Sequence, residues 1–332
     1  MTALIEVSNL TIRFRTDEGL VTAVEDVSFT LGKGEVMGLV GESGSGKSVT
    51  AKALMSLNAR NAVYGEDSRI TLHADTGPVE VLKLKTAREL KIVRGGAISM
   101  IFQEPMASFA PAITIGRQMV EQLQLHGDMS KARAKEISVE MLDRVGISDP
   151  ARRFDQYAFE LSGGMRQRAM IAMALSTKPK LLIADEPTTA LDVTIQAQVI
   201  DLMKDLVSEF HMGIVFITHD LGVIAQTADK VSVMYLGRLI EEGPVREVIR
   251  NPKHPYTQGL IAALPKLDDL DAPLTPVAGD IPSPLERPSG CVFHTRCPQI
   301  LGDICKTDLP RDRRVDPVHR VACHLHDEKT PA

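Results

Sequence analysis

The sequence predicts an α/β protein built around a mostly parallel sheet, and three observations lead to that class. Strand-like and helix-like segments alternate through the middle of the chain, as they do when helices cover a parallel sheet. The apolar run 36–40 leads into a glycine-rich loop and then into a helical segment that begins at Ser48. A second apolar run, 181–184, ends in two adjacent carboxylates.

The other elements are predicted from local periodicity. Near the N-terminus, residues 5–14 and 23–31 alternate apolar and polar side chains, as antiparallel strands do. Residues 60–96 are polar and contain one short strand-like segment, 79–84. Further strands are expected at 98–102 and 214–217 and in a hairpin of 231–235 with 238–242, and helices at 115–146, from Gly163 to 175, and at 195–210.

Length and composition limit the possible classes of protein. The chain has 332 residues, 44% of them hydrophobic, which is enough for one large domain and a smaller one. The formal net charge of -5 gives no strong basic field, so nucleic acid is not expected as a partner. No signal peptide is evident, and no apolar stretch approaches the roughly 18–20 residues that cross a bilayer. We therefore expect an intracellular chain that serves a membrane only by docking on other subunits.

The texture of the sequence changes near residue 250. Prolines become frequent after Asn251, which breaks any long regular element. We predict two domains, residues 1–250 and residues 251–332. All four cysteines lie in the second, and a reducing compartment argues against their being structural disulfides. Their clustering predicts a shared role.

The glycine-rich loop fits the pattern G-x-x-x-x-G-K-[ST] of phosphate-binding loops. In such loops the backbone N–H groups turn inward around phosphates, and the following helix points its positive end at them. Lys47 should reach the β- and γ-phosphates, and the Ser48 hydroxyl should ligate Mg²⁺. The expected nucleotide-binding segment is Gly41, Glu42, Ser43, Gly44, Ser45, Gly46, Lys47, Ser48 and Val49.

The two carboxylates after the run 181–184 have separate expected roles. Asp185 should hold Mg²⁺, directly or through water, and Glu186 should act as the general base that polarises the attacking water. Acidic strand ends are common, so the pattern gains its meaning from the phosphate loop in the same chain.

Four further segments carry a resemblance to ATP-binding cassette (ABC) ATPases, because they match the family's signature motif, Q-loop, D-loop and switch histidine. With the two sites above, six motifs follow the family's order within residues 1–250. The resemblance implies a P-loop ABC ATPase domain, with a mostly parallel sheet core, an antiparallel β subdomain and a helical subdomain, followed by a small loop-rich C-terminal extension that carries the cysteines. The four segments are Leu161-Ser162-Gly163-Gly164-Met165, Ile101-Phe102-Gln103-Glu104-Pro105, Ala190-Leu191-Asp192 and Thr218-His219-Asp220.

The resemblance also implies roles for residues. Two ATP molecules would lie between two cassettes, with the signature residues Ser162, Gly163 and Gly164 serving the nucleotide of the opposite subunit. Phe14 would stack on adenine, with a place in the core as the alternative. Asp192 would span the dimer interface. The implied catalytic set is Lys47, Gln103, Glu186 and His219, and the implied Mg²⁺ ligands are Ser48, Gln103 and Asp185.

Within the family, the chain resembles the oligopeptide, dipeptide and nickel importer ATPases through residues 103–106, 160–168, 185–194 and 251–257, and the resemblance extends to Cys323. Two segments depart from that branch. Phe109-Ala110-Pro111 replaces Leu-Asn-Pro, and Tyr157-Ala158-Phe159 replaces Tyr-Pro-His. The first follows the Q-loop, where the branch receives its permease, so it weakens an inference about cargo.

The branch implies an ATPase subunit bound peripherally at the cytoplasmic face of the inner membrane. Its partners would be a second cassette (itself or a paralogue), two permease subunits and an external solute-binding protein, without nucleic acid. Peptides are the leading cargo, and oligosaccharides or other small solutes are the alternative. A non-transport ABC ATPase and a regulator that does not hydrolyse ATP are more remote. The single cassette argues against the former, and Glu186 with His219 against the latter.

The four cysteines, Cys291, Cys297, Cys305 and Cys323, have 5, 7 and 17 residues between them. This spacing is wider than the Cys-x₂₋₄-Cys pairs of structural zinc sites. Similar extensions in the branch hold a [4Fe–4S] cluster on four thiolates, which the resemblance therefore implies here. Zinc and unligated buried thiols remain alternatives. The nearby residues His294, His319 and His324 could replace a ligand, although a surface position is the more ordinary expectation for each.

Overall fold

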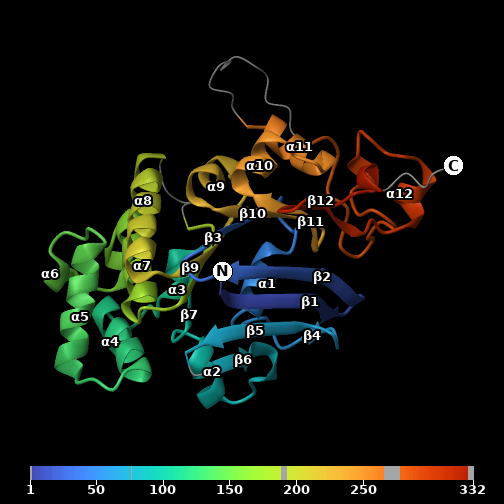
Figure 1. The fold of residues 1–332 in the computed structure, drawn as a ribbon. Helices are drawn as coiled ribbons and strands as arrows, with labels where there is room; N and C mark the ends of the chain where they lie inside the picture. The colour runs from blue at the N-terminus through green and yellow to red at the C-terminus, as the bar shows by residue number, and fades with distance from the viewer. Residues whose placement is uncertain (1, 76, 188–192, 265–276, 328–332) are drawn as a thin grey trace. The chain divides into compact units, whose positions relative to one another are not determined.

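The computed structural model describes residues 2–75, 77–187, 193–264 and 277–327 (Figure 1). The chain forms two compact units, each assembled from separate stretches of sequence. The first, here called the helical unit, contains residues 1–5, 31–35 and 71–215. The second, the loop unit, contains residues 6–30, 36–70 and 216–332. Within the described ranges, no helix is both long enough and apolar enough to cross a membrane.

The core of the helical unit is a parallel pair of strands, β7 (Ile98–Ile101) and β8 (Leu181–Asp185). Every residue of both strands is buried, which explains their unbroken apolar sequences. Helix α7 (Gly163–Ser176) packs on β7. The predicted strands at 98–102 and 181–184 and the helix that starts at Gly163 are therefore confirmed.

Helices α4 (Ile115–His126) and α5 (Lys131–Arg144) pack on α7, and α6 (Pro150–Phe154) packs on α4 and α5 (green and yellow-green in Figure 1). The helical character predicted over 115–146 is present, but it is divided between α4 and α5. Gly127 ends α4 in an extended conformation, and the Ser130 hydroxyl caps α5 by accepting the Arg133 N–H at 3.2 Å. The rest of the unit adds the short helix α3 (Pro105–Ser108) and the long helix α8 (Val193–Phe210).

The segment 60–96 is more structured than its polar sequence predicts. Strands β5 (Arg69–Ala74) and β6 (Gly77–Glu80) pair antiparallel, and a 3₁₀ turn at Val81–Lys83 replaces the end of the predicted strand 79–84. Helix α2 (Ala87–Val93) was not predicted. It starts with a capping box, because the Thr86 hydroxyl accepts the Glu89 N–H while the Glu89 carboxylate accepts the Thr86 N–H.

The loop unit holds the strand order β12-β13-β11-β10-β3. Strand β3 (Val36–Val40) lies parallel to β10 (Lys230–Tyr235), which forms the predicted antiparallel hairpin with β11 (Arg238–Pro244). Helices α9 (Leu221–Thr227) and α10 (Val245–Arg250) pack beside these strands (Figure 1). The long N-terminal strands β1 (Ala3–Thr16) and β2 (Gly19–Gly32) confirm the two predicted there, and β1 pairs antiparallel with β4 (Ala62–Tyr64).

The C-terminal extension is less loop-like than predicted. It contains helices α11 (Pro255–Ala262) and α12 (Asp303–Thr307), together with the hairpin of β12 (Asp312–Asp316) and β13 (His319–Ala322). Strand β13 pairs antiparallel with β11, so the end of the extension continues the sheet that carries β3. The division of the chain into residues 1–250 and 251–332 stays a prediction.

A buried carboxylate joins the extension to the sheet. Glu241 on β11 has no exposed side-chain surface and accepts hydrogen bonds from His319 Nε2 at 2.7 Å, the Lys253 N–H at 2.6 Å and the His254 N–H at 3.0 Å. Burial raises the pKa of Glu241, but the hydrogen bonds from His319 and from the Lys253 and His254 N–H groups lower it by more, so the net shift of the pKa is downward. Burial lowers the pKa of His254 to about 4, which keeps this imidazole neutral near pH 7.

The histidines near the cysteines differ from expectation, because two of the three are buried. His319 is 1% exposed and bonded to Glu241. His324 is 7% exposed and lies 2.7 Å from the Asp327 carboxylate. Both therefore support the fold of the extension.

Candidate ATP site

The loop between β3 and α1 (Lys47–Ala53) has backbone conformations that only glycine adopts without strain. Gly41, Gly44 and Gly46 have φ values of +151°, +77° and +97°. A Cβ on Gly41 would lie 2.2 Å from the Met234 carbonyl oxygen, and one on Gly46 would lie 2.6 Å from the Ala23 carbonyl oxygen. The strand–loop–helix arrangement predicted for residues 36–57 is present, with the helix ending at Ala53.

Lys47 is held across this loop. Its side chain is buried, and Nζ donates to the Gly41 carbonyl at 2.7 Å, the Glu42 carbonyl at 2.8 Å and Ser45 Oγ at 3.2 Å. Ser48 and Val49 follow at the start of α1 and are half-buried. The loop thus holds the Lys47 ammonium against its own oxygen atoms, and the Ser48 hydroxyl comes one residue later.

Two more predicted site residues belong to the loop unit. Phe14 lies on β1, opposite Ala62 of β4, and is half-buried, so it is not part of the fully buried core. His219 follows β9 (Gly213–Thr218) and is exposed. The next residue, Asp220, caps α9 by accepting the N–H groups of Gly222 and Val223, which fixes the backbone just after His219.

The helical unit brings together two of the predicted catalytic side chains. Asp185 is the buried last residue of β8, and Glu186 follows with φ at +45°, an uncommon conformation for a residue other than glycine. Gln103, just beyond β7, donates from Nε2 to Glu186 Oε2 at 2.8 Å. The parallel pairing of Ile101 with Ala184 places these two segments side by side.

The signature segment opens α7 with exposed backbone. Ser162 Oγ accepts the Met165 N–H at 3.3 Å, and both Ser162 and Gly163 are exposed. Among the residues that the structure describes, no atom outside the two chain neighbours and the helix's own backbone lies within 4 Å of the position that a Cβ on Gly163 would take. The start of this 14-residue helix therefore presents N–H groups and a positive dipole to its surroundings, and local packing does not require glycine there.

Sequence reasoning did not single out Gln167. This side chain is 3% exposed on α7, and its Nε2 donates to the Pro187 carbonyl just after Glu186. The bond ties the signature helix to the end of the acidic strand. A polar residue on an otherwise apolar helix face was the available signal.

The predicted site residues are divided between the two units. The phosphate loop, Phe14 and His219 belong to the loop unit, and Gln103, the acidic pair and the signature segment belong to the helical unit. Asp192 lies outside the described residues.

The two departures from the importer branch differ in exposure. Phe109 is 4% exposed, so its ring belongs to the core, whereas Ala110 and Pro111 of the same segment are exposed, and the link of this segment to a permease stays a prediction. The Tyr157 and Phe159 rings stack with centroids 5.4 Å apart, and Phe159 is 61% exposed.

The four thiols of the extension are free, and all but the half-buried Cys297 are buried. The Cys291 N–H donates to the Cys305 carbonyl at 2.9 Å. Burial, then the charges of the other thiols, raise the pKa of Cys291 to about 11 and that of Cys323 to about 12. Among the described residues, no group of three or more His, Cys, Asp or Glu side chains is arranged to hold a metal ion. The [4Fe–4S] cluster and the zinc alternative therefore stay predictions.

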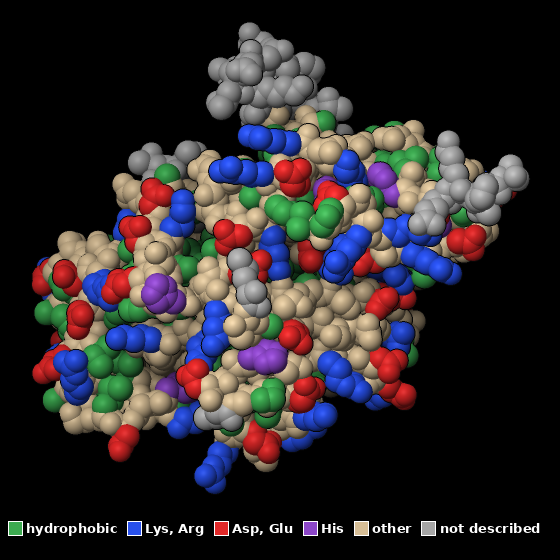
Figure 2. Space-filling view, in the orientation of Figure 1, with side chains coloured by type: hydrophobic (Ala, Val, Ile, Leu, Met, Phe, Trp, Pro, Cys, Tyr) green, Lys and Arg blue, Asp and Glu red, His purple; other side chains and the backbone are tan. Residues whose placement is uncertain are grey.

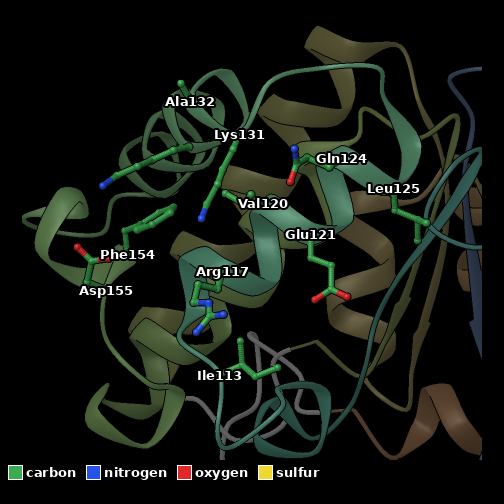
Figure 3. A pocket seen from close by; sticks show the side chains of 11 residues that line it. Ile113, Arg117, Val120, Glu121, Gln124, Leu125, Lys131, Ala132, Phe154 and Asp155 are labelled. Atoms are coloured by element: carbon green, nitrogen blue, oxygen red, sulfur yellow. The ribbon is translucent and has the colours of Figure 1, made fainter.

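A pocket of about 890 Å³ opens among α4, α5 and α6 of the helical unit. Figure 3 shows Arg117, Lys131 and Phe154, from three different helices, around a common space. None of the predicted site residues lines it. On the face of the molecule drawn in Figure 2, acidic and basic side chains are interspersed. The complete lining is Ile113, Arg117, Val120, Glu121, Gln124, Leu125, Lys131, Ala132, Lys135, Phe154 and Asp155.

The phosphate loop after β3, the acidic end of β8 and the capped signature helix define a P-loop ATPase of the ABC class. Residues 24–189 match the ABC transporter family, and residues 240–305 match the family described as the C-terminal region of oligopeptide and dipeptide transporters. The chain therefore belongs to the ABC transporter ATPases.

Relatives cover nearly the whole chain. It is 51% identical to the oligopeptide transport ATP-binding protein OppD of Salmonella typhimurium over 92% of this chain and 89% of that protein. It is 47% identical to a putative peptide import ATP-binding protein of Brucella melitensis over 96% of both chains. Among solved structures, the ATP-binding cassette MJ0796, a dimer in a post-hydrolysis state bound to ADP and Pi, matches with a TM-score of 0.63 and 25% identity over 73% of this chain and 99% of that one.

Proposed function

We propose that this chain is the ATP-hydrolysing subunit of an ABC importer for peptides. Relatives named for peptide import, matching almost end to end at 47% and 51% identity, support the cargo class. The contact of Gln103 with Glu186 at the end of β8 carries the catalytic part of the proposal, because it joins two groups that the reaction needs. Oligosaccharides and other small solutes are the alternative cargo.

The roles of the residues follow from their chemistry. The N–H groups of residues 41–49 and the Lys47 ammonium would bind the ATP phosphates, while Phe14 would stack on adenine. Glu186 would take the proton of the attacking water, and Gln103 would orient that water. His219 would contact the γ-phosphate, and Asp192 would act across the dimer interface. Ser48, Gln103 and Asp185 would hold Mg²⁺, which neutralises phosphate charge when bound.

Complete sites would require two cassettes. The start of α7 supports this, because Ser162 and Gly163 are exposed and a side chain at position 163 would enter open space. The dimeric state of MJ0796 supports it as well. The second cassette would be a copy or a paralogue. The pair would bind two permease subunits at the cytoplasmic face of the inner membrane, and an external binding protein would deliver the cargo.

Substituting Gly163 by valine tests the shared site. We expect the free energy of unfolding to change by less than about 0.5 kcal/mol, because the new side chain enters open space. We expect ATPase activity of the assembled transporter to fall at least about tenfold, since the side chain would block the partner's nucleotide. Lys131→Val, at the same position after the Ser130 cap of α5, is the control. Normal ATPase activity in Gly163→Val would contradict the shared site.

The cysteines are proposed as ligands of a [4Fe–4S] cluster. Each thiolate of such a cluster binds a different iron, so the four sulfurs lie further apart than around one metal ion. Support comes from the donor set, which is four free cysteines in one extension, and from the backbone N–H groups that bond to the sulfurs of Cys291, Cys297 and Cys323, namely those of Phe293, His294, Gln299 and Leu325.

Metal analysis tests this proposal. We expect iron and sulfide close to 4 atoms each per chain after anaerobic purification, as the cluster's formula requires. Cys305→Ser should lower both. Protein that contains neither iron nor zinc under these conditions would leave unligated thiols as the correct interpretation.

A further inference from the structure

One residue of the phosphate loop, Glu42, is bonded twice by the C-terminal extension. Its backbone N–H donates to the Tyr256 hydroxyl at 2.8 Å. Its carboxylate accepts from both terminal nitrogens of Arg296, at 2.7 Å and 3.1 Å. Tyr256 belongs to α11, and Arg296 ends a 3₁₀ turn, His294–Arg296, that is 254 residues distant from Glu42 in sequence. All three residues lie within the loop unit.

Arg296 is also held by groups outside the phosphate loop. Its side chain is 3% exposed, Nε donates to the Ala278 carbonyl at 2.9 Å, and a terminal nitrogen donates to the Val277 carbonyl at 3.1 Å. The other terminal nitrogen lies 3.3 Å from the Tyr235 hydroxyl. A guanidinium with this many partners holds one orientation, so its two bonds to Glu42 are directional and charge-assisted.

Tyr256 is equally constrained. Its side chain is fully buried, and its ring packs against Tyr235 and Phe293 with centroids 4.8 Å and 5.3 Å away. Burial raises the pKa of its phenol, so the hydroxyl stays protonated near pH 7. The ring cluster therefore presents a neutral hydroxyl at a set position to the Glu42 N–H.

These contacts act on the part of the loop that orients Lys47. The Glu42 carbonyl accepts from Lys47 Nζ, so the N–H, side chain and carbonyl of this one residue are all bonded. Arg296 also offsets the negative charge of Glu42, which would otherwise repel an incoming polyphosphate. Fixing the loop before binding avoids an ordering cost when the ligand arrives.

We propose that Arg296 and Tyr256 are positioning residues for ATP binding, and that the C-terminal extension thereby sets the nucleotide affinity of the phosphate loop. The proposal rests on the proposed function, since it requires this loop to bind the phosphates of ATP. The segment 251–257 resembles the start of the extension in peptide importers. Through the Tyr256 hydroxyl, it accepts a hydrogen bond directly from the phosphate loop.

Two variants of the full-length chain test the proposal by titration with a fluorescent ATP analogue. Arg296→Met removes the charge and keeps the side-chain length, whereas Tyr256→Phe removes only the hydroxyl. We expect Kd to rise about tenfold for Arg296→Met and about threefold for Tyr256→Phe. The control is Arg313→Met, which removes an ion pair with Asp327 elsewhere in the extension and should leave Kd unchanged.

Two further measurements separate positioning from general stability. Hydrogen exchange of a peptide covering residues 41–48 should accelerate in Tyr256→Phe, while exchange in β10 stays as in the wild type. Adding Glu42→Gln to Arg296→Met should recover part of the affinity, because it removes the uncompensated carboxylate. Wild-type Kd and wild-type loop exchange in both variants would overturn the proposal. A wild-type chain that fails to bind ATP would instead overturn the proposed function.

Discussion

Replacing Glu186 by glutamine is expected to lower kcat for ATP hydrolysis by about 10²–10⁴-fold, the usual contribution of a general base. Glutamine keeps the size of the side chain and can still accept the hydrogen bond from Gln103 Nε2, but it cannot take a proton from water. ATP affinity should stay within about twofold, because Glu186 is not among the residues proposed to bind the ATP phosphates, the adenine or Mg²⁺. Steady-state ATPase assays and nucleotide titration measure the two quantities.

Glu104→Gln is the matched control for this substitution. Glu104 is an exposed glutamate next to Gln103, and its side chain does not cap α3. It should retain kcat within about twofold. If Glu186→Gln hydrolyses ATP at the rate of this control, Glu186 is not the base and the role must pass to another group.

Replacing Glu241 by alanine is expected to destabilise the chain by about 3–5 kcal/mol, the cost of removing one partner from a buried ionic network. The change leaves His319 Nε2 and the N–H groups of Lys253 and His254 without their acceptor. Chemical denaturation of the full chain, followed by far-UV circular dichroism, measures the effect. Glu247→Ala, at an exposed position on α10, should change stability by less than about 0.5 kcal/mol.

The pH dependence gives an independent check on Glu241. Because the folded-state pKa of Glu241 lies below its ordinary value of 4.5, its contribution is complete above that pH and is lost as the pH falls through the folded-state pKa. The stability difference between wild type and Glu241→Ala should therefore shrink in acid. A difference below 1 kcal/mol at pH 7 would mean that the extension is held to the sheet by other contacts.

The sequence predicts the strand–loop–helix geometry of the phosphate loop well because its residues are consecutive. The phosphate loop occupies eight consecutive positions, and its glycines have the positive φ angles that explain their spacing. The contact of Gln103 with Glu186 can also be understood from the sequence. Gln103 comes two residues after the buried strand β7, Glu186 comes directly after the buried strand β8, and the two strands are parallel neighbours.

Other features were beyond sequence reasoning for physical reasons. The sequence of the hairpin β12–β13 has no clear apolar alternation. These residues form strands because β13 pairs with β11, not because of their own sequence pattern. The bonds of Glu42 to Tyr256 and Arg296 join residues more than 200 positions apart, which no periodicity encodes. The break between α4 and α5 was readable, because Gly127 and Ser130 are ordinary stop and start signals.

The most direct test of the peptide-import ATPase is the ATPase activity of the assembled transporter, copurified with its permeases and supplied with its binding protein. Peptide pools and oligosaccharide pools are compared in the wild type and in Glu186→Gln. We expect peptides to stimulate hydrolysis in the wild type and neither pool to do so in the variant. Stimulation by oligosaccharides alone would contradict the assignment of peptides as cargo, and hydrolysis that persists in Glu186→Gln would contradict the catalytic site itself.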